Sequence, residues 1–277
     1  MQNALNHFWV LFVFFTIQLI IATLLGWACN WFLEELPPRA LGWAFHDGWW
    51  RDLLFGASIG AASLTLAVAC AALGGGLRFS SAEIALAAFK MLTTSAAFFL
   101  IAAAFEEVFF RGYPLQTLMR SWPFPLALAP FTGLFALGHL GNPNAAPLFT
   151  FINTALAGIW LAVAYYRTRS LWFPLGVHWA WNWTQGPLFG LPVSGITSLN
   201  SAPVLRASDY GPAWLTGGAY GIEGGVACTI ALILSTLFIW HTQLLRATDE
   251  MKAYTDHENL KPAHKGLTID ASRLRDN

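Results

Sequence analysis

The chain has 277 residues, of which 56% are hydrophobic and only 11% are charged, and its mean hydropathy is +0.51. A soluble domain carries about 25% charged residues, so this composition excludes an ordinary water-facing globule and indicates an integral membrane protein. Fifteen basic residues balance fifteen acidic ones, and this balance removes the usual electrostatic basis for binding nucleic acid.

Seven windows are long and apolar enough to be candidate membrane spans, since a helix needs roughly 20 apolar residues to cross the bilayer core. In chain order they cover residues 8–32, 53–73, 86–105, 124–139, 147–166, 171–190 and 226–240. Two of them, 124–139 and 171–190, are interrupted by Pro, Gly and polar residues. An eighth span in the Gly-rich stretch 214–225 stays an alternative. The predicted fold is therefore an all-α, polytopic transmembrane bundle of seven spans, or eight.

The chain is expected to form one bundle over residues 1–246, followed by a polar tail over residues 247–277. The first window lacks the basic N-terminal region and the small-residue cleavage site of a signal peptide, so we expect it to remain in the protein as a membrane span. With seven spans, most Arg and Lys residues fall on one side, and only Arg78 and Arg206 fall clearly on the other. By the positive-inside rule, the N-terminus is predicted outside and the flexible tail in the cytoplasm.

Two acidic residues, Glu106 and Glu107, directly follow the apolar run 95–105. A charged side chain near the centre of a membrane helix costs about 2.5–3.5 kcal/mol, so both carboxylates need either a partner or a function. Arg111 lies four residues after Glu107, so on a helix the two side chains share a face and can pair. Glu106 points about 100° away. We predict that Glu107 pairs with Arg111 and that Glu106 stays free.

Two histidines, His139 and His178, lie within or at the end of interior apolar windows. Phe135 precedes His139 by four residues, and Asn182 follows His178 by four, so each pair shares a helical face. A single histidine on an apolar face has an ordinary packing explanation, and two neighbouring glutamates can simply be solvated at a membrane surface. Two histidines and the unpaired Glu106, on three separate spans, point instead to a functional site.

This combination of side chains is suited to hydrolysis by activated water. A carboxylate in an apolar cavity can act as a general base toward water, and a neutral histidine can share the proton transfer. A second histidine and an asparagine can donate hydrogen bonds to an oxyanion. Two histidines and a glutamate are also a ligand set for catalytic zinc, although no His-Glu-x-x-His helix is present. Hydrolysis with zinc or another divalent metal bound to Glu106, His139 and His178, and hydrolysis without a metal, both stay open.

Three motifs carry a family resemblance: Glu106–Gly112, Phe135–His139 and His178–Asn182. Together, in this order, they resemble the CPBP family of intramembrane proteases, which groups the type 2 CAAX prenyl endopeptidases with bacteriocin-processing and immunity proteins. The resemblance covers about residues 86–190, which would form the catalytic core. It implies a helical bundle with a conical cavity that opens to the cytoplasm and to lipid.

The resemblance also implies a role for each matching residue. The residues that match Glu106 and His139 would activate water, and those that match His178 and Asn182 would hold the oxyanion. Glu107 and Arg111 would shape the site. The spacing of four residues, independently of the resemblance, predicts that Phe135 packs beside His139.

The predicted function is an intramembrane endopeptidase that cleaves membrane-associated peptides or proteins in a bacterial cytoplasmic membrane. Its expected partners are that substrate and the lipid bilayer. A proton-coupled transporter is one alternative, because membrane carboxylates and histidines also build proton relays. A non-catalytic immunity protein that keeps the same residues as a scaffold is another.

Overall fold

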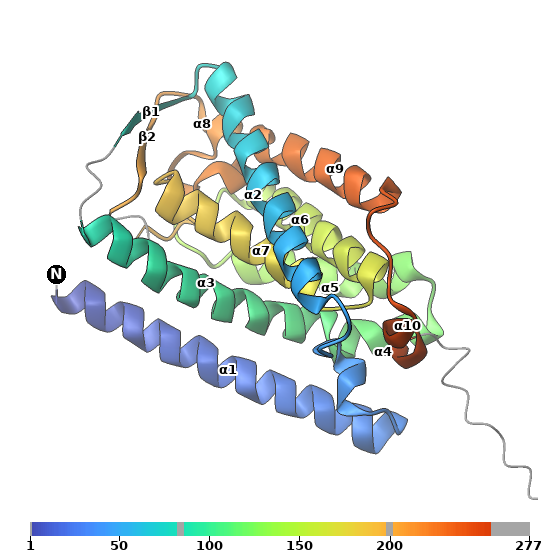
Figure 1. Cartoon of the computed structure of the whole chain (residues 1–277). Helices are drawn as coiled ribbons and strands as arrows, with labels where there is room; N and C mark the ends of the chain where they lie inside the picture. Colours follow the sequence, from blue (N-terminus) through green and yellow to red (C-terminus); the bar gives the residue numbers. More distant parts are fainter. Residues whose placement is uncertain (1, 82–85, 198–201, 256–277) are drawn as a thin grey trace, which may run out of the picture.

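The computed structural model describes residues 2–81, 86–197 and 202–255 and is predominantly helical (Figure 1). Each of the seven predicted windows contains one main helix. These helices are α1 (Gln2–Glu34), α2 (Trp49–Leu73), α3 (Leu86–Arg111), α5 (Phe124–His139), α6 (Pro147–Thr168), α7 (Trp172–Trp183) and α9 (Val226–His241). The prediction of a helical chain is confirmed.

Four helical segments are long and apolar enough to cross a membrane: Phe8–Glu34, Trp49–Leu73, Ala88–Ser121 and Pro147–Thr168. The third of these joins α3 to the short helix α4 (Tyr113–Ser121). The helices α5 and α9 are apolar but shorter. These lengths are those of an integral membrane protein, and the total of seven spans stays a prediction.

The window 171–190 and the stretch 214–225 are both broken into shorter pieces. After Trp183, α7 continues as the π-helical turn η2 (Thr184–Leu188), which contains Pro187. Because proline has no backbone N–H to donate within a helix, the regular α-helical hydrogen-bond pattern ends there. The stretch 214–225 forms α8 (Ala213–Thr216), η3 (Gly218–Tyr220) and η4 (Ile222–Gly224). Each of these is far too short to cross a bilayer.

One two-stranded sheet adds to the predicted all-α fold. The strands β1 (Leu77–Ser81) and β2 (Leu205–Asp209) pair in antiparallel register, with Leu77 opposite Asp209. Both strands are short and largely exposed, so neither carries the alternating apolar pattern that predicts a strand from sequence. Backbone pairing between two connecting segments makes this sheet.

The main helices run back and forth between two ends of the bundle (Figure 1). The strand end contains β1, β2 and the start of α1. The α10 end contains the 3₁₀ turn η1 (Pro38–Leu41), α4 and the terminal helix α10 (Asp249–Thr255). The start of α1 and α10 therefore lie at opposite ends of the bundle (Figure 1).

The helix that carries His178, α7, packs closely along α2. Glycines permit this contact: a Cβ on Gly60 would lie 2.1 Å from the carbonyl oxygen of Val177, and a Cβ on Gly176 would lie 2.1 Å from that of Leu53. Small residues let membrane helices approach at backbone distance, where van der Waals packing holds them together. The position of His178, next to Val177, is thus set by a close helix pair.

The first helix, α1, packs mainly against α3 through aromatic rings. Phe15 contacts Phe98 and Phe105, with ring centroids 5.8 and 6.0 Å apart, and Phe8 contacts Phe98 at 5.5 Å. Many large apolar side chains on the rest of α1 are exposed. An apolar surface of this size is suited to lipid and not to water.

The predicted tail, residues 247–277, is described only in part. Its first residues form α10, with Met251 fully buried and Glu250 within 3.7 Å of Arg39. The remaining residues, 256–277, lie outside the described residues, and most of the predicted tail lies with them.

Candidate functional site

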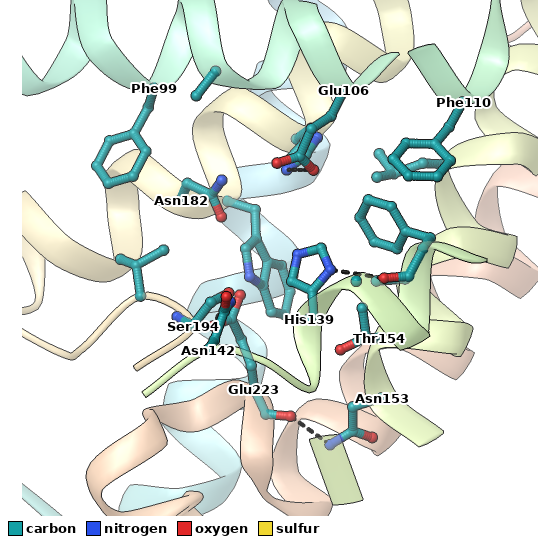
Figure 2. Close-up of a pocket in the computed structure, with 18 of the residues that line it drawn as sticks. Phe99, Glu106, Phe110, His139, Asn142, Asn153, Thr154, Asn182, Ser194 and Glu223 are labelled. Carbon is teal, nitrogen blue, oxygen red and sulfur yellow. Dashed lines mark hydrogen bonds and ion pairs between the residues drawn. The ribbon is translucent and has the colours of Figure 1, made fainter. Parts of the chain in front are cut away.

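A cavity of about 360 Å³ brings the predicted site residues together. Glu106 enters it from α3, Phe135 and His139 from α5, and His178 and Asn182 from α7 (Figure 2). Aromatic side chains of α1 and α3 line it as well. Residues that lie on three separate predicted spans therefore face one space.

The two neighbouring glutamates of α3 have different surroundings. Glu107 is fully buried, and its Oε1 lies 3.3 Å from Nη1 of Arg111, one helical turn away. Glu106 faces the cavity with 21% of its side chain exposed. Its Oε2 is buried without a hydrogen-bond partner among the described residues, and Nε2 of His178 lies 3.9 Å from it. The predicted pair of Glu107 with Arg111 is present, whereas Glu106, predicted to be free, lies within ion-pair distance of His178.

The ring of His178 is held by Glu107. Nδ1 of His178 lies 2.8 Å from Oε1 of Glu107. A carboxylate only accepts hydrogen bonds, so Nδ1 carries a proton and donates it. Nε2 is then left on the side of Glu106, where it donates a hydrogen bond only when the ring is an imidazolium. Glu107 thus fixes both the orientation and the tautomer of this histidine.

The ring of His139 is held by its own helix. Its Nδ1 lies 2.8 Å from the carbonyl oxygen of Phe135, four residues earlier. A carbonyl only accepts, so Nδ1 again carries the proton, and Nε2 of the neutral ring has a free lone pair. Figure 2 shows that this second nitrogen points away from the Phe135 carbonyl and into the cavity. His139 therefore presents a base toward the space that Glu106 also faces.

Phe135 packs between the histidine of its own helix and the charged residues of α3. Its ring centroid lies 4.6 Å from that of His139 and 4.7 Å from the guanidinium carbon of Arg111. A guanidinium over an aromatic face is favourable. Arg111 also donates to the carbonyl of Gly158 on α6, at 3.3 Å. This packing fixes α5 and α6 against the Glu107–Arg111 pair.

Asn182 shares the cavity-facing side of α7 with His178, as the spacing of four residues predicts. Of the three tryptophans beside them, Trp181 also lines the cavity. Trp179 and Trp183 instead donate their indole N–H groups to α3, to the carbonyls of Ala96 at 2.9 Å and Leu92 at 3.0 Å. These two bonds fix α7 against the helix that carries Glu106.

The proposed zinc ligands do not form a metal cluster in this arrangement. Within residues 2–81, 86–197 and 202–255, no three His, Cys, Asp or Glu side chains lie close enough together to hold a metal ion. A catalytic zinc site needs three such ligands. Glu106, His139 and His178 therefore do not fit a zinc ion as they are placed here.

The far wall of the cavity contains polar residues that the sequence analysis missed: Asn142, Asn153, Thr154, Ser194 and Glu223 (Figure 2). The Oε2 atom of Glu223 accepts hydrogen bonds from the backbone N–H of Ser194 at 2.5 Å and from its hydroxyl at 3.0 Å. Gln185 donates to the same oxygen at 3.2 Å. A sequence signal existed, because Glu223 is the one acidic residue of the Gly-rich stretch 214–225.

Tyr220 lies near this wall in a protected environment. Burial, and after it the charge of Glu223, raise the pKa of its hydroxyl above the ordinary value. The phenol therefore stays neutral and does not compete with the glutamates as an acid or a base.

Comparison with known proteins identifies the same part of the chain. Residues 88–184 match the family described as Rce1-like, type II CAAX prenyl endopeptidase Rce1-like. No curated protein and no solved structure matches the chain. The matched segment contains every residue of the three motifs and lies within the predicted core, 86–190, so the resemblance to the CPBP proteases is confirmed. Residues 88–184 of this chain are thus similar to the Rce1-like family of type II CAAX prenyl endopeptidases.

Proposed function

We propose that this protein is an intramembrane endopeptidase that hydrolyses peptide bonds of membrane-associated polypeptides with an activated water. The observation that carries the proposal is the shared cavity: the free carboxylate of Glu106 and the second ring nitrogens of His139 and His178 all face it. The family of residues 88–184 supports the same class of reaction.

In the proposed reaction, Glu106 is the general base. Its unbonded Oε2 takes a proton from a water molecule as the water oxygen attacks the carbonyl carbon of the scissile bond. Nε2 of His139, with its lone pair turned into the cavity, accepts a hydrogen bond from the other O–H of that water and orients it. General bases placed in this way contribute about 10²–10⁴-fold to a rate.

The oxyanion that forms on the scissile carbonyl is held from α7. Asn182 donates from its amide, and His178 donates from Nε2 as an imidazolium, with Nδ1 bonded to Glu107. Donors fixed before the reaction are worth several kcal/mol when charge develops in a water-poor site. Glu107 and Arg111 act as positioning residues, because they hold His178 and do not reach the cavity themselves.

The intermediate collapses when the bond from carbon to nitrogen breaks. The protonated Glu106 returns its proton to the leaving nitrogen, which gives a carboxylic acid and an amine. The acid then passes its own proton to the amine to leave a carboxylate and an ammonium group. Glu106 is then ionised again for the next turnover.

The cavity lining favours a lipid-associated substrate. Phe15, Phe98 and Phe105 contribute apolar surface on the side of α1 and α3. The name of the family points to prenylated C-terminal sequences as one substrate class. We therefore propose both lipid-modified and single-span peptides as candidate substrates.

The orientation we propose places the α10 end in the cytoplasm. Arg39, Arg120, Arg167, Arg169 and Arg246 belong to segments at that end, whereas Arg78 and Arg206 lie on the strands of the other. This asymmetry follows the positive-inside rule. Labelling of a single cysteine introduced at Gln243 by an impermeant reagent, from the cytoplasmic side only, tests it, and labelling from outside only would reverse the assignment.

Cleavage by purified protein in proteoliposomes tests the function. A panel of prenylated C-terminal peptides and unmodified single-span peptides is compared with wild type, Glu106→Gln and His139→Ala, each checked for folding by its melting temperature. We expect wild type to cleave at least one class and both variants to lose cleavage while they stay folded. Undiminished cleavage by both variants would reject the assignment. Proton-driven solute uptake that needs Glu106, without any proteolysis, would support the transporter instead.

A further inference from the structure

A second cavity, of about 480 Å³, lies at the α10 end and shares no lining residue with the first. It lies between the end of α6 and the segment that joins α9 to α10. Its charged lining residues are all basic: Arg167, Arg169, Arg246 and Lys252, with His241 beside them. No Asp or Glu is among its lining residues. A concave site with this charge favours an anion.

Arg167 is built into the wall of this basic pocket. Its Nη2 donates to the carbonyls of Thr242 at 2.6 Å and Leu245 at 2.9 Å, which fixes the chain after α9 against α6. Its Nε is buried and has no hydrogen-bond partner within the described part of the chain. The guanidinium is thus held in place by neutral carbonyls, and its positive charge is not cancelled.

Two further cations of the basic pocket, Arg246 and Lys252, are also weakly neutralised. Arg246 bonds only to the neutral amide of Gln243, at 3.2 Å, and like Arg167 it forms no ion pair with any described residue. Lys252 lies 3.5 Å from Asp249, whose side chain is fully exposed. Exposed ion pairs of this kind contribute little and are screened by salt. The pocket therefore keeps a net positive charge.

An apolar wall adjoins the basic pocket. The rings of Tyr166 and Trp240 stack at 5.9 Å with an interplanar angle of 10°, and Phe124 stacks on Tyr166 at 4.3 Å. Trp240 is 43% exposed and Leu244 is 74% exposed. Aromatic side chains at the ends of spans mark the membrane interface. A free phosphate ion would make no favourable contact with this apolar wall, whereas the glycerol and acyl chains of a lipid would pack against it.

We propose that this basic pocket binds the phosphate headgroup of an anionic phospholipid at the membrane surface. Basic pockets between membrane helices are a known form of lipid recognition. Arg167 from α6, Arg246 from the segment after α9 and Lys252 from α10 surround the phosphate, and the acyl chains follow Tyr166 and Trp240. The proposal depends on the position of the α10 end at a membrane surface and not on peptidase activity.

Lipid binding to the full-length protein tests this proposal. Delipidated protein in a neutral detergent is titrated with phosphatidylglycerol, phosphatidylcholine or inorganic phosphate, and binding is followed by native mass spectrometry and by the melting temperature. The pocket variant is Arg246→Gln with Lys252→Gln, two exposed changes in the lining of the pocket. The matched control is Arg78→Gln with Arg206→Gln at the strand end.

We expect phosphatidylglycerol, and not phosphatidylcholine, to bind and to raise the melting temperature by mass action. The pocket variant should weaken this binding roughly 30-fold, or about fivefold for each cationic side chain removed, while the control pair leaves it unchanged. Should the pocket variant not fold, Arg246→Gln alone, an exposed change, should give the fivefold loss.

Four results would overturn the proposal. The first is equal binding of both lipids, and the second is equal loss in the pocket and control variants. The third is an equal stabilisation by inorganic phosphate alone, which would assign the site to the free ion. Unchanged binding by Arg246→Gln would contradict it as well.

Discussion

The buried carboxylate of Glu107 lies 2.8 Å from Nδ1 of His178 and turns the other nitrogen of that ring toward Glu106. The same oxygen of Glu107 pairs with Arg111. One buried acid thus fixes both a cation of its own helix and the histidine of another. This contact connects α3 to α7 at the point where the proposed chemistry occurs.

Replacement of Glu107 should damage both stability and turnover. Glu107→Ala leaves Arg111 as a buried charge without its partner, and breaking such a pair costs about 3–5 kcal/mol. His178 also loses the acceptor that orients it, so kcat should fall more than KM rises. Melting temperatures and steady-state kinetics on the cleaved peptide measure the two effects.

The double variant Glu107→Ala with Arg111→Met is the control for this prediction. It removes the unpaired buried charge of Arg111, so most of the lost stability should return. The value of kcat should stay low because His178 still lacks the hydrogen-bond acceptor that orients it. Full recovery of kcat in the double variant would show that Glu107 acts only through stability.

The close contact between α2 and α7 should be sensitive to a single methyl group. Gly60→Ala would place a Cβ 2.1 Å from the backbone of Val177, next to His178. Overpacking of this kind costs about 1–3 kcal/mol, and α7 must shift to relieve it. We expect a lower melting temperature and a loss of cleavage that exceeds the loss of folded protein.

Gly133→Ala is the matched control, because no atom lies within 4 Å of a Cβ at that position. It should leave both measurements at the wild-type level. Similar effects of the two substitutions would contradict a role for the α2–α7 contact in positioning His178.

Glu223 should influence substrate binding more than chemistry. Its carboxylate holds Ser194, which lines the cavity wall opposite Glu106 (Figure 2). Glu223→Ala removes the acceptor for the Ser194 N–H and hydroxyl, so that wall should loosen and KM should rise with a smaller change in kcat. A loss of kcat as large as that of Glu106→Gln would instead place Glu223 among the catalytic groups.

Metal removal should leave cleavage intact. In the part of the chain that the structure describes, no three potential metal ligands converge, so the proposed reaction uses no metal step. The prediction is tested by elemental analysis of the purified protein and by cleavage after treatment with a chelator. Activity that disappears with the chelator and returns with one divalent metal would contradict it.

Local spacing explains what the sequence could predict. The pairs Glu107 and Arg111, and His178 and Asn182, are one helical turn apart, and the first forms an ion pair while the second shares the cavity. The bounds of α5, Phe124–His139, agree with the predicted window. Prolines near its start and the loss of apolar periodicity after His139 mark both ends.

Contacts between distant segments could not be predicted in this way. The bond from Glu107 to His178 joins two helices, and its two residues have no periodic relation in sequence. Glu223 holds Ser194 across a Gly-rich stretch, where positive φ angles at Gly217 and Gly221 set the path of the chain. The pairing of Leu77 with Asp209 is likewise a product of tertiary structure.

The central claim is that Glu106 and His139 act on one water, and a double-mutant cycle on kcat/KM measures it most directly. Glu106→Gln, His139→Ala and the double variant are compared with wild type on the same membrane peptide. Each single change should cost about 10²–10⁴-fold, and the double variant should be no slower than the slower single, because groups that act as a unit are not additive. Multiplied losses in the double variant, or cleavage at the wild-type rate in either single variant, would contradict the claim.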